Sequence, residues 1–474
     1  MRTPALAALF GAALLVPNAA FADEPMPPEQ RPDFVLAPLA DDLIDFTVET
    51  FTLDNGLRVA VVPDDASPTV AIAVYYDVGS RNEEEGRSGF AHLFEHMMFQ
   101  GSANVGKGEH FQYIARNGGS MNGTTSEDRT NYFEILPSDR LELGLWLESD
   151  RMRSLEVTEE NFENQREVVK EERRLRVDNQ PWVPGWLDFY VQAYDGEGPY
   201  GHSVIGSMAD LDAAEVEDVQ AFFDLYYAPN NAILVLAGDV TRAQAEPLVE
   251  RWFGDIPRGN APPPVVIERP ERDGPTYLET DDHHATAAAA ILGWIVPQAP
   301  GAENDAARIL AEILGSGESS RLYDRMVRTD ATALDVSASI DGRRGPDLFM
   351  AYAIAAGDTP ATELRDAVLD EVERLRTEGV TEDDIDAARR RIVRQQVERV
   401  EGNLGRAIRV ARDFLYYDEP DRVNGLVARL NAVTPNDVQA VLDAYLVDDN
   451  LTVMHIEPIA DEDAEDTDAS EGGE

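Results

Sequence analysis

The sequence has 474 residues, which is enough for two or more domains with substantial hydrophobic cores. Its 90 acidic and 40 basic residues give a formal net charge of −50, which argues against a nucleic acid partner because phosphates would be repelled. Cysteine is absent, so neither a disulfide framework nor a lipid anchor on a cysteine is expected.

The first residues have the features of a secretory signal peptide, which we predict to span residues 1–22. Arg2 supplies the positive charge, an apolar run follows, and Ala20-Phe21-Ala22 fits a cleavage site. No other apolar run reaches the length of a membrane-spanning helix. We therefore expect an exported protein without a membrane span, located in a bacterial periplasm or else secreted. Residues 23–45 are predicted to form an N-terminal linker.

Residues 46–257 are predicted to form the first domain, which opens with β-structure. Asn55-Gly56 is a strong hairpin signal between two apolar segments, Phe51–Leu53 and Leu57–Val62. Thr69–Val78 then predicts a strand that leads to a helix with an unusual pattern of polar residues.

That helix contains His92-Leu93-Phe94-Glu95-His96, an H-x-x-E-H sequence. Positions i and i+4 share one helix face, so both imidazoles can reach one metal ion, and Glu95 lies close enough to act on water there. The same order occurs in inverted zinc peptidase motifs. The alternative is an ordinary amphipathic helix with two histidines. Apolar residues flank the motif on most sides, so the helix should be buried, where these polar groups need partners.

Catalytic zinc sites usually have three protein ligands, so one ligand is missing from this motif. A second helix, opened by Thr158 as its N-cap, supplies a candidate. At about 100° per residue, Glu172 falls near the centre of its apolar arc and Glu171 falls at the edge. A carboxylate on a buried face is costly unless it is paired with a charge, so Glu172 is predicted to be the third ligand. The alternative, a solvated Glu-rich helix, fits Glu171 better.

The chain contains a long internal repeat. Residues 218–226 recur as 437–445, and in both copies a helix and a short loop precede an apolar strand, at 232–237 and 451–456. The repeat predicts an α+β fold with two homologous domains. Each domain is expected to be a mostly antiparallel sheet packed with helices on one face.

The second domain is predicted to span residues 276–460 and to lack the metal. It follows a proline-rich linker at residues 258–275, and residues 461–474 form an acidic tail that we expect to be disordered. The segment 305–314 takes the place of the motif helix but has no histidine, and Gln395 replaces the candidate carboxylate ligand.

Together these features resemble the pitrilysin and insulin-degrading-enzyme family of zinc peptidases, in the branch that contains mitochondrial processing peptidase and its bacterial relatives. The resemblance rests on the motif helix, the spacing from His96 to Glu172, the segment 164–181 and the duplicated halves. It covers about residues 46–458. Pro199-Tyr200-Gly201-His202 also matches a family pattern, in which the histidine is expected to be structural rather than a ligand.

The resemblance implies one zinc ion per chain, held by His92, His96 and Glu172. Glu95 would be the general base that takes a proton from the attacking water. Manganese or cobalt would suit the same ligands.

The resemblance also implies an extended peptide substrate that pairs with an edge strand of the first domain. The matching stretch is Ser120–Phe133, with Asn122 and Tyr132 as the expected contacts. Pairing between backbones would give affinity that tolerates many sequences. The composition of this stretch fits an ordinary edge strand equally well.

Two positions depart from the family pattern. A second glutamate that many members carry seven residues before the ligand glutamate is Gln165 here. In the second half, Arg328 aligns with a substrate-binding Arg, but the Tyr expected seven residues later is Asp335, and a carboxylate would repel an oxyanion. Relatives with this division carry the Arg and Tyr on a separate chain. We therefore expect a heterodimer with a homologous partner subunit, and a homodimer is the alternative.

The resemblance therefore predicts a zinc-dependent endopeptidase or oligopeptidase that hydrolyses peptides or unfolded segments, as the catalytic subunit of a two-chain enzyme. The alternative is a non-catalytic structural subunit, or a peptide- or zinc-binding subunit, of the same fold. Glu95 separates these classes, because only a peptidase needs it to cleave peptides. One hypothesis for the acidic net charge is adaptation to saline surroundings, where salt screens the repulsion between like charges.

Overall fold

The computed structural model describes residues 37–459. The predicted signal peptide at 1–22 and acidic tail at 461–474 lie outside this range, as does most of the predicted linker 23–45. From Leu39 onward, the described residues belong to one compact unit. Between residues 37 and 459, no helix is both long and apolar enough to cross a membrane.

The first sheet has six strands in the order β1-β2-β6-β3-β5-β4. Neighbouring strands are antiparallel except for β2 and β6. The predicted hairpin joins β1 to β2, and Gly56 at its turn has φ +96°, which a residue with a Cβ rarely adopts. The strands are β1 (Glu49–Thr52), β2 (Arg58–Pro63), β3 (Thr69–Tyr76), β4 (Ser120–Thr125), β5 (Thr130–Pro137) and β6 (Ala232–Gly238).

The second sheet has five strands in the order β7-β11-β8-β10-β9, which repeats the order β2-β6-β3-β5-β4 of the first. Its parallel pair, β11 with β7, corresponds to β6 with β2. Asn231 donates a side-chain hydrogen bond to Tyr226 O, and Asn450, its equivalent in the repeat, donates the same bond to Tyr445 O. The strands are β7 (Thr276–Asp282), β8 (Ala289–Val296), β9 (Ala333–Ile340), β10 (Asp347–Ala355) and β11 (Leu451–Pro458). The predicted α+β fold with duplicated sheets is confirmed.

Helices pack on both sheets, and two of the longest begin where the sequence predicts. Thr158 and Thr381 are N-caps whose hydroxyl oxygens accept hydrogen bonds from Asn161 N and Asp384 N. Residues 258–275 contain no helix or strand. The helices are α1 (Phe90–Met97), α2 (Glu109–Arg116), α3 (Leu141–Ser154), α4 (Glu159–Arg173), α5 (Val183–Ala193), α6 (Met208–Ala213), α7 (Val216–Tyr226), α8 (Arg242–Phe253), α9 (Ala302–Gly315), α10 (Ala361–Glu378), α11 (Glu382–Val400), α12 (Asn403–Tyr417), α13 (Leu426–Ala432) and α14 (Pro435–Tyr445).

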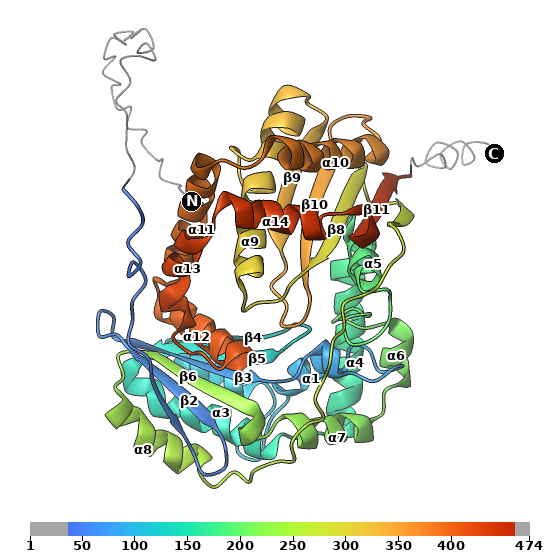
Figure 1. The fold of residues 1–474 in the computed structure, drawn as a ribbon. Helices are drawn as coiled ribbons and strands as arrows, with labels where there is room; N and C mark the ends of the chain where they lie inside the picture. Colours follow the sequence, from blue (N-terminus) through green and yellow to red (C-terminus); the bar gives the residue numbers. More distant parts are fainter. Residues whose placement is uncertain (1–36, 460–474) are drawn as a thin grey trace, which may run out of the picture. The chain divides into compact units, whose positions relative to one another are not determined.

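Each sheet is also covered on its second face by a helix from the other half of the chain. Helix α12, from the second half, packs on the first sheet through a cluster that joins Val410 and Phe414 to Val62 and Val235. Helix α5, from the first half, packs on the second sheet in the same way (Figure 1). The sequence predicted helices on only one face of each sheet. The helix that comes from the other half of the chain covers the second face.

The stretch predicted as one edge strand, Ser120–Phe133, is instead a hairpin. The edge strand is β4, and β5 lies between β4 and β3. The break falls at Ser126–Arg129, where Ser126 N donates to Arg129 O. Arg129 also donates from Nη1 to Thr124 O at 2.7 Å, which holds the turn closed. Residues on β5 therefore belong to the sheet interior, whereas β4 keeps a free edge.

Candidate metal centre

Helix α1 places the two motif histidines side by side, with ring centroids 4.9 Å apart. The helix begins after Gly89, and its first amides are bonded by a carboxylate: Glu83 accepts from Gly89 N at 3.0 Å and from Ala91 N at 2.7 Å. His202 Nε2 lies 3.0 Å from Glu83 Oε2 and 2.9 Å from Ser80 O. His202 therefore supports the start of the helix, in keeping with the structural role expected of it.

Glu172 approaches the same point from α4, which packs against α1. Its Oε2 lies 3.2 Å from His96 Nε2 and 3.7 Å from His92 Nε2, while Arg176 Nη1 lies 3.0 Å from its Oε1. The three candidate ligand atoms lie within 4.8 Å of one another. A π-helical turn, Arg174–Asp178, follows α4 directly, and such turns are frequent at functional sites.

The electrostatics of the three residues suit a divalent cation. Burial lowers the pKa of His92 to about 4, so its imidazole is neutral and has a free lone pair. The hydrogen bond from His96 lowers the pKa of Glu172, so the carboxylate stays ionised. Two imidazoles and one carboxylate are a typical ligand set for zinc, and the spacing of their ligand atoms is compatible with one ion.

Glu95 lies beside this cluster and is held by the edge strand. Thr125 at the end of β4 donates to Glu95 Oε2 at 2.6 Å. A Cβ at position 123 would lie 3.3 Å from Glu95 Cγ, so Gly123 lets the helix approach the strand closely. Burial raises the pKa of Glu95, which makes its carboxylate a stronger base toward a proton of water.

A cavity of about 1070 Å³ opens over these residues. Its wall includes both histidines, Glu95, Glu172 and the predicted substrate contact Asn122. The remaining wall is partly apolar, and three of its side chains are well exposed: Phe111 at 43 %, Val168 at 42 % and Leu175 at 56 %. The cavity therefore presents a polar cluster, a free strand edge and apolar surface to a bound molecule.

The other predicted substrate contacts lie elsewhere. Tyr132 is fully buried on β5, directly opposite Gly123 of β4, so its side chain packs in the core and the prediction that it touches substrate needs correction. Arg328 lies in a π-helical segment, Tyr323–Thr329, where it pairs with Asp324 at 3.1 Å; it does not line this cavity.

Gln165 and Asp335, which depart from the family pattern, have different surroundings. Gln165 lines the cavity, and its side-chain amide donates to Asn164 Oδ1 at 2.9 Å. Asp335 lies on the edge strand β9 of the second sheet, where Tyr352 on β10 donates to its carboxylate at 2.8 Å. A phenol thus accompanies the carboxylate at this position, although it comes from the neighbouring strand.

A second buried cluster, which the sequence patterns did not indicate, lies between β5, α2 and α3. His110 Nε2 is 3.5 Å from Glu134 Oε2 and 3.9 Å from Glu148 Oε1. Ligand atoms at these distances are compatible with a metal ion. Glu148, however, is bound through both carboxylate oxygens by the guanidinium of Arg151, whose side chain is only 2 % exposed, so a cation there would face an unscreened positive charge. Arg176 beside Glu172 is by contrast 77 % exposed. We therefore regard the cluster as a buried ionic network.

Comparisons with known proteins identify the family of the chain. Residues 58–186 match a family described as Insulinase (Peptidase family M16), and residues 213–392 match one described as Peptidase M16 inactive domain. The chain is 30 % identical over 418 residues to the zinc protease PqqE of Helicobacter pylori, covering 86 % of this chain and 93 % of that protein.

Two solved structures have the same fold. A protease from Helicobacter pylori superposes with a TM-score of 0.83 at 28 % identity, covering 87 % of this chain and 100 % of that one. The periplasmic protease PqqL of Escherichia coli superposes with a TM-score of 0.72 at 19 % identity. That match covers 89 % of this chain but only 48 % of PqqL, so PqqL is about twice as long.

Proposed function

The chain belongs to peptidase family M16, and from this premise we propose that it is a zinc-dependent endopeptidase or oligopeptidase that cleaves peptides or unfolded segments. The observation that carries the proposal is the convergence of His92, His96, Glu172 and Glu95 on one wall of a cavity. Relatives named zinc protease support the choice of zinc.

The proposed mechanism assigns one role to each side chain. His92, His96 and Glu172 would hold one zinc ion, which supplies Lewis-acid activation of water and of the peptide carbonyl. Glu95 takes the proton of the attacking water and returns it to the leaving amine as the C–N bond breaks. The hydroxyl of Thr125, 2.6 Å from Glu95, keeps that carboxylate on the side of the cavity where the peptide enters.

The free edge of β4 is the proposed platform for the substrate. A peptide that adds as a further strand would place backbone groups beside Glu95 and could be held irrespective of its sequence. Asn122 is exposed on this strand and lines the cavity, so it is the proposed polar contact to the peptide. This mode of binding requires an extended chain, which favours peptides and unfolded segments over folded proteins.

We further propose that the active enzyme is a pair of homologous chains, with a heterodimer preferred over a homodimer. Asp335 stands where an oxyanion-stabilising Tyr is expected, and Arg328 is exposed and does not line the cavity of its own chain. This chain matches only 48 % of PqqL, which is about twice as long. The rest of PqqL has room for a second pair of domains. A periplasmic location is proposed from the predicted signal peptide and from the location named for PqqL.

The experiment compares wild type with Glu95→Gln on a quenched peptide library, using the chain alone and with its homologous partner. Glu95→Gln should keep zinc and lose hydrolysis by at least about a thousandfold. Chelation should also stop cleavage, and added zinc should restore it. Cleavage that is unchanged in Glu95→Gln, or unaffected by chelation, would mean that the chain is not a zinc peptidase.

The second candidate is a subunit of the same fold that binds peptide or zinc without catalysis. The observation in its favour is Asp335, because a chain without its own oxyanion-stabilising group is incomplete as an enzyme. This candidate predicts zinc binding and peptide binding with no turnover, even when the partner is present.

A further inference from the structure

The turn between β9 and β10, Asp341–Pro346, reaches from the second half of the chain to the end of β4, the strand proposed to bind substrate. It meets the loop Ser126–Arg129, which joins β4 to β5. Arg344 N donates to Asp128 Oδ2 at 2.8 Å, and Arg344 Nη1 lies 2.6 Å from Asp77 Oδ1. A turn of the half that lacks the metal motif thus contacts the end of the strand proposed to bind substrate.

Arg343 is the centre of this contact. It is 4 % exposed, and its guanidinium lies 3.1 Å from Glu127 Oε1. The rings of three tyrosines surround the guanidinium, with centroids 5.5, 4.6 and 4.7 Å from Cζ for Tyr190, Tyr194 and Tyr200. A cation enclosed by aromatic faces and paired with a carboxylate is held in one place.

Hydrogen bonds fix the conformation of the turn. Asp347 Oδ1 accepts from Gly342 N at 2.8 Å and from Arg343 N at 3.1 Å, and Arg412 Nη2 donates to Gly342 O at 2.7 Å. Tyr200 ties the two sides together, since its hydroxyl donates to Asp128 Oδ1 at 2.6 Å and accepts from the turn at Gly345 N. Movement of either side would therefore break several hydrogen bonds at once.

The contact adjoins the proposed catalytic group. Glu127 and Arg343 line the same cavity as Glu95. Glu127 follows closely after Thr125, whose hydroxyl holds Glu95 at 2.6 Å. A shift of the Ser126–Arg129 loop would therefore move Thr125 away from Glu95 and displace the free edge of β4.

We propose that the β9–β10 turn is a positioning element for the catalytic strand, with Arg343 as its positioning residue. The turn holds β4 in place and keeps Thr125 on Glu95. The second half would thus contribute to the reaction by fixing the position of β4 in the first half of the same chain. It would supply neither a metal ligand nor a reacting group. The catalytic part of this inference rests on the proposed peptidase function, whereas the mechanical part concerns the order of β4 and stands by itself.

The test uses the full-length, zinc-loaded chain with its partner where activity requires one, and compares Arg343→Met with Arg272→Met. Arg272 is a fair control because its side chain is also nearly buried, at 7 % exposure, and pairs with Asp195 at 2.7 Å. It does not line the cavity. The readouts are hydrogen exchange of the amides at 120–129, zinc content, and kcat and KM for a peptide.

Arg343→Met should speed exchange at residues 120–129 by about tenfold or more and lower kcat by about tenfold, with zinc content unchanged. Arg272→Met should leave exchange in that segment within about twofold of wild type. Glu127→Gln should change exchange and kcat in the same direction as Arg343→Met but by less, because Arg343 keeps Asp341 and the three tyrosine rings as partners in that variant. The double variant should be no worse than Arg343→Met alone, because the Arg343–Glu127 interaction is already lost there. Arg343→Lys should recover part of the loss, since a lysine keeps the charge but not the planar stacking.

Exchange at 120–129 that stays at the wild-type rate in Arg343→Met, or that rises equally in Arg272→Met, would overturn the proposal. If Arg343→Met does not fold, Arg343→Lys and Glu127→Gln give the same comparison. If exchange changes as expected while wild type cleaves no peptide, the peptidase assignment fails and the mechanical role of the turn stands.

Discussion

Replacing Glu134 with glutamine is predicted to stabilise the protein increasingly as the pH rises. Glu134 lies on β5 and is 1 % exposed, and among residues 37–459 neither of its carboxylate oxygens has a hydrogen-bond partner. Burial raises its pKa from the ordinary 4.5 to about 7, and the charge of Arg151 opposes only part of that effect. The folded protein therefore binds this proton more tightly than the unfolded chain does.

The size of the effect follows from the two pKa values. The stabilisation from the bound proton is complete below pH 4.5 and is lost as the pH rises through 7. The full loss is about 3 kcal/mol, of which about 2.5 kcal/mol falls between pH 5 and pH 8. Glutamine stays neutral throughout, so the stability of Glu134→Gln relative to wild type should grow by that amount over this range.

The assay is urea unfolding at pH 5 and pH 8 for wild type, Glu134→Gln and Glu142→Gln. Glu142 is a suitable control because it lies on α3 but is exposed, where it pairs with Arg251 at 2.7 Å. The neighbours of Glu134 are present in every protein, including His110, whose pKa burial lowers to about 3, so their own pH dependence largely cancels in the difference. A difference between Glu134→Gln and wild type that stays constant from pH 5 to pH 8 would refute the reasoning.

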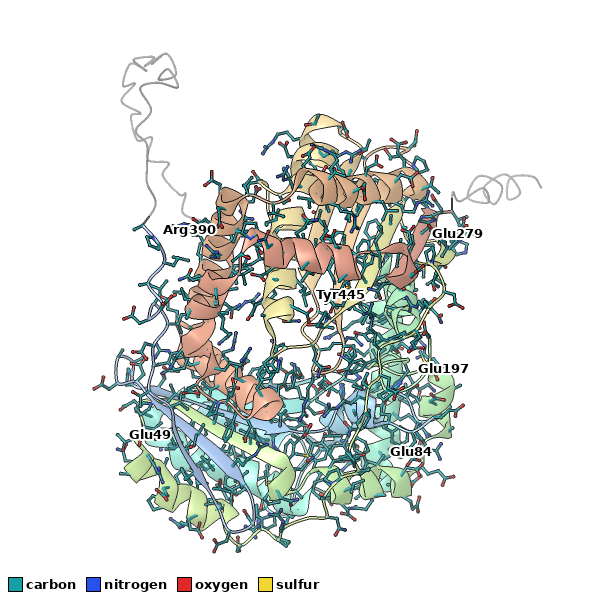
Figure 2. All side chains as sticks on the ribbon, in the orientation of Figure 1. Glu49, Glu84, Glu197, Glu279, Arg390 and Tyr445 are labelled. Atoms are coloured by element: carbon teal, nitrogen blue, oxygen red, sulfur yellow. The ribbon has the colours of Figure 1, made fainter. Side chains whose placement is uncertain are left out.

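Three further outcomes are expected. Glu172→Gln should weaken zinc affinity by at least about tenfold in a competition titration, whereas Glu171→Gln should not, and equal losses would remove Glu172 from the ligand set. Tyr132→Phe should leave KM for peptides within about twofold because the ring is buried, and a large rise in KM would put its hydroxyl on the substrate. The melting temperature should rise by several degrees between about 0.05 M and 1 M NaCl, because salt screens acidic side chains such as Glu84, Glu197 and Glu279 (Figure 2); a temperature independent of salt would contradict the saline hypothesis.

The parts of the site that the sequence predicts are those set by helical periodicity. His92 and His96 share a face because their spacing is close to one helical turn. Glu172 lies with them, although two members of the apolar arc that suggested it, Val168 and Leu175, are exposed in the structure rather than buried. The duplicated sheet order likewise follows from the repeat that is visible in segments 218–226 and 437–445. In each case a local pattern determines which side chains share a face.

The parts that the sequence did not predict depend on contacts between distant segments. Arg343 and Glu127 come from opposite halves of the chain, and no periodicity relates a turn of the second sheet to a loop of the first. Tyr132 was expected as a contact from the family resemblance, which does not say which side chains of the stretch are buried; β5 is internal and Tyr132 is fully buried. The polar turn at 126–129, which divides the stretch into two strands, was the available signal that β5 is internal.

The exchange of helices shows what the half without the metal motif contributes to packing. Every residue of β6 in the first sheet and of β8 in the second is buried, and a strand buried throughout needs cover on both faces. For the first sheet that second cover is α12, and for the second sheet it is α5, each from the opposite half (Figure 1). Loss of the second half would expose the apolar face under α12, in addition to releasing the turn that holds β4. The second half, which has no histidine in the segment 305–314, therefore still supplies packing on which the first sheet depends.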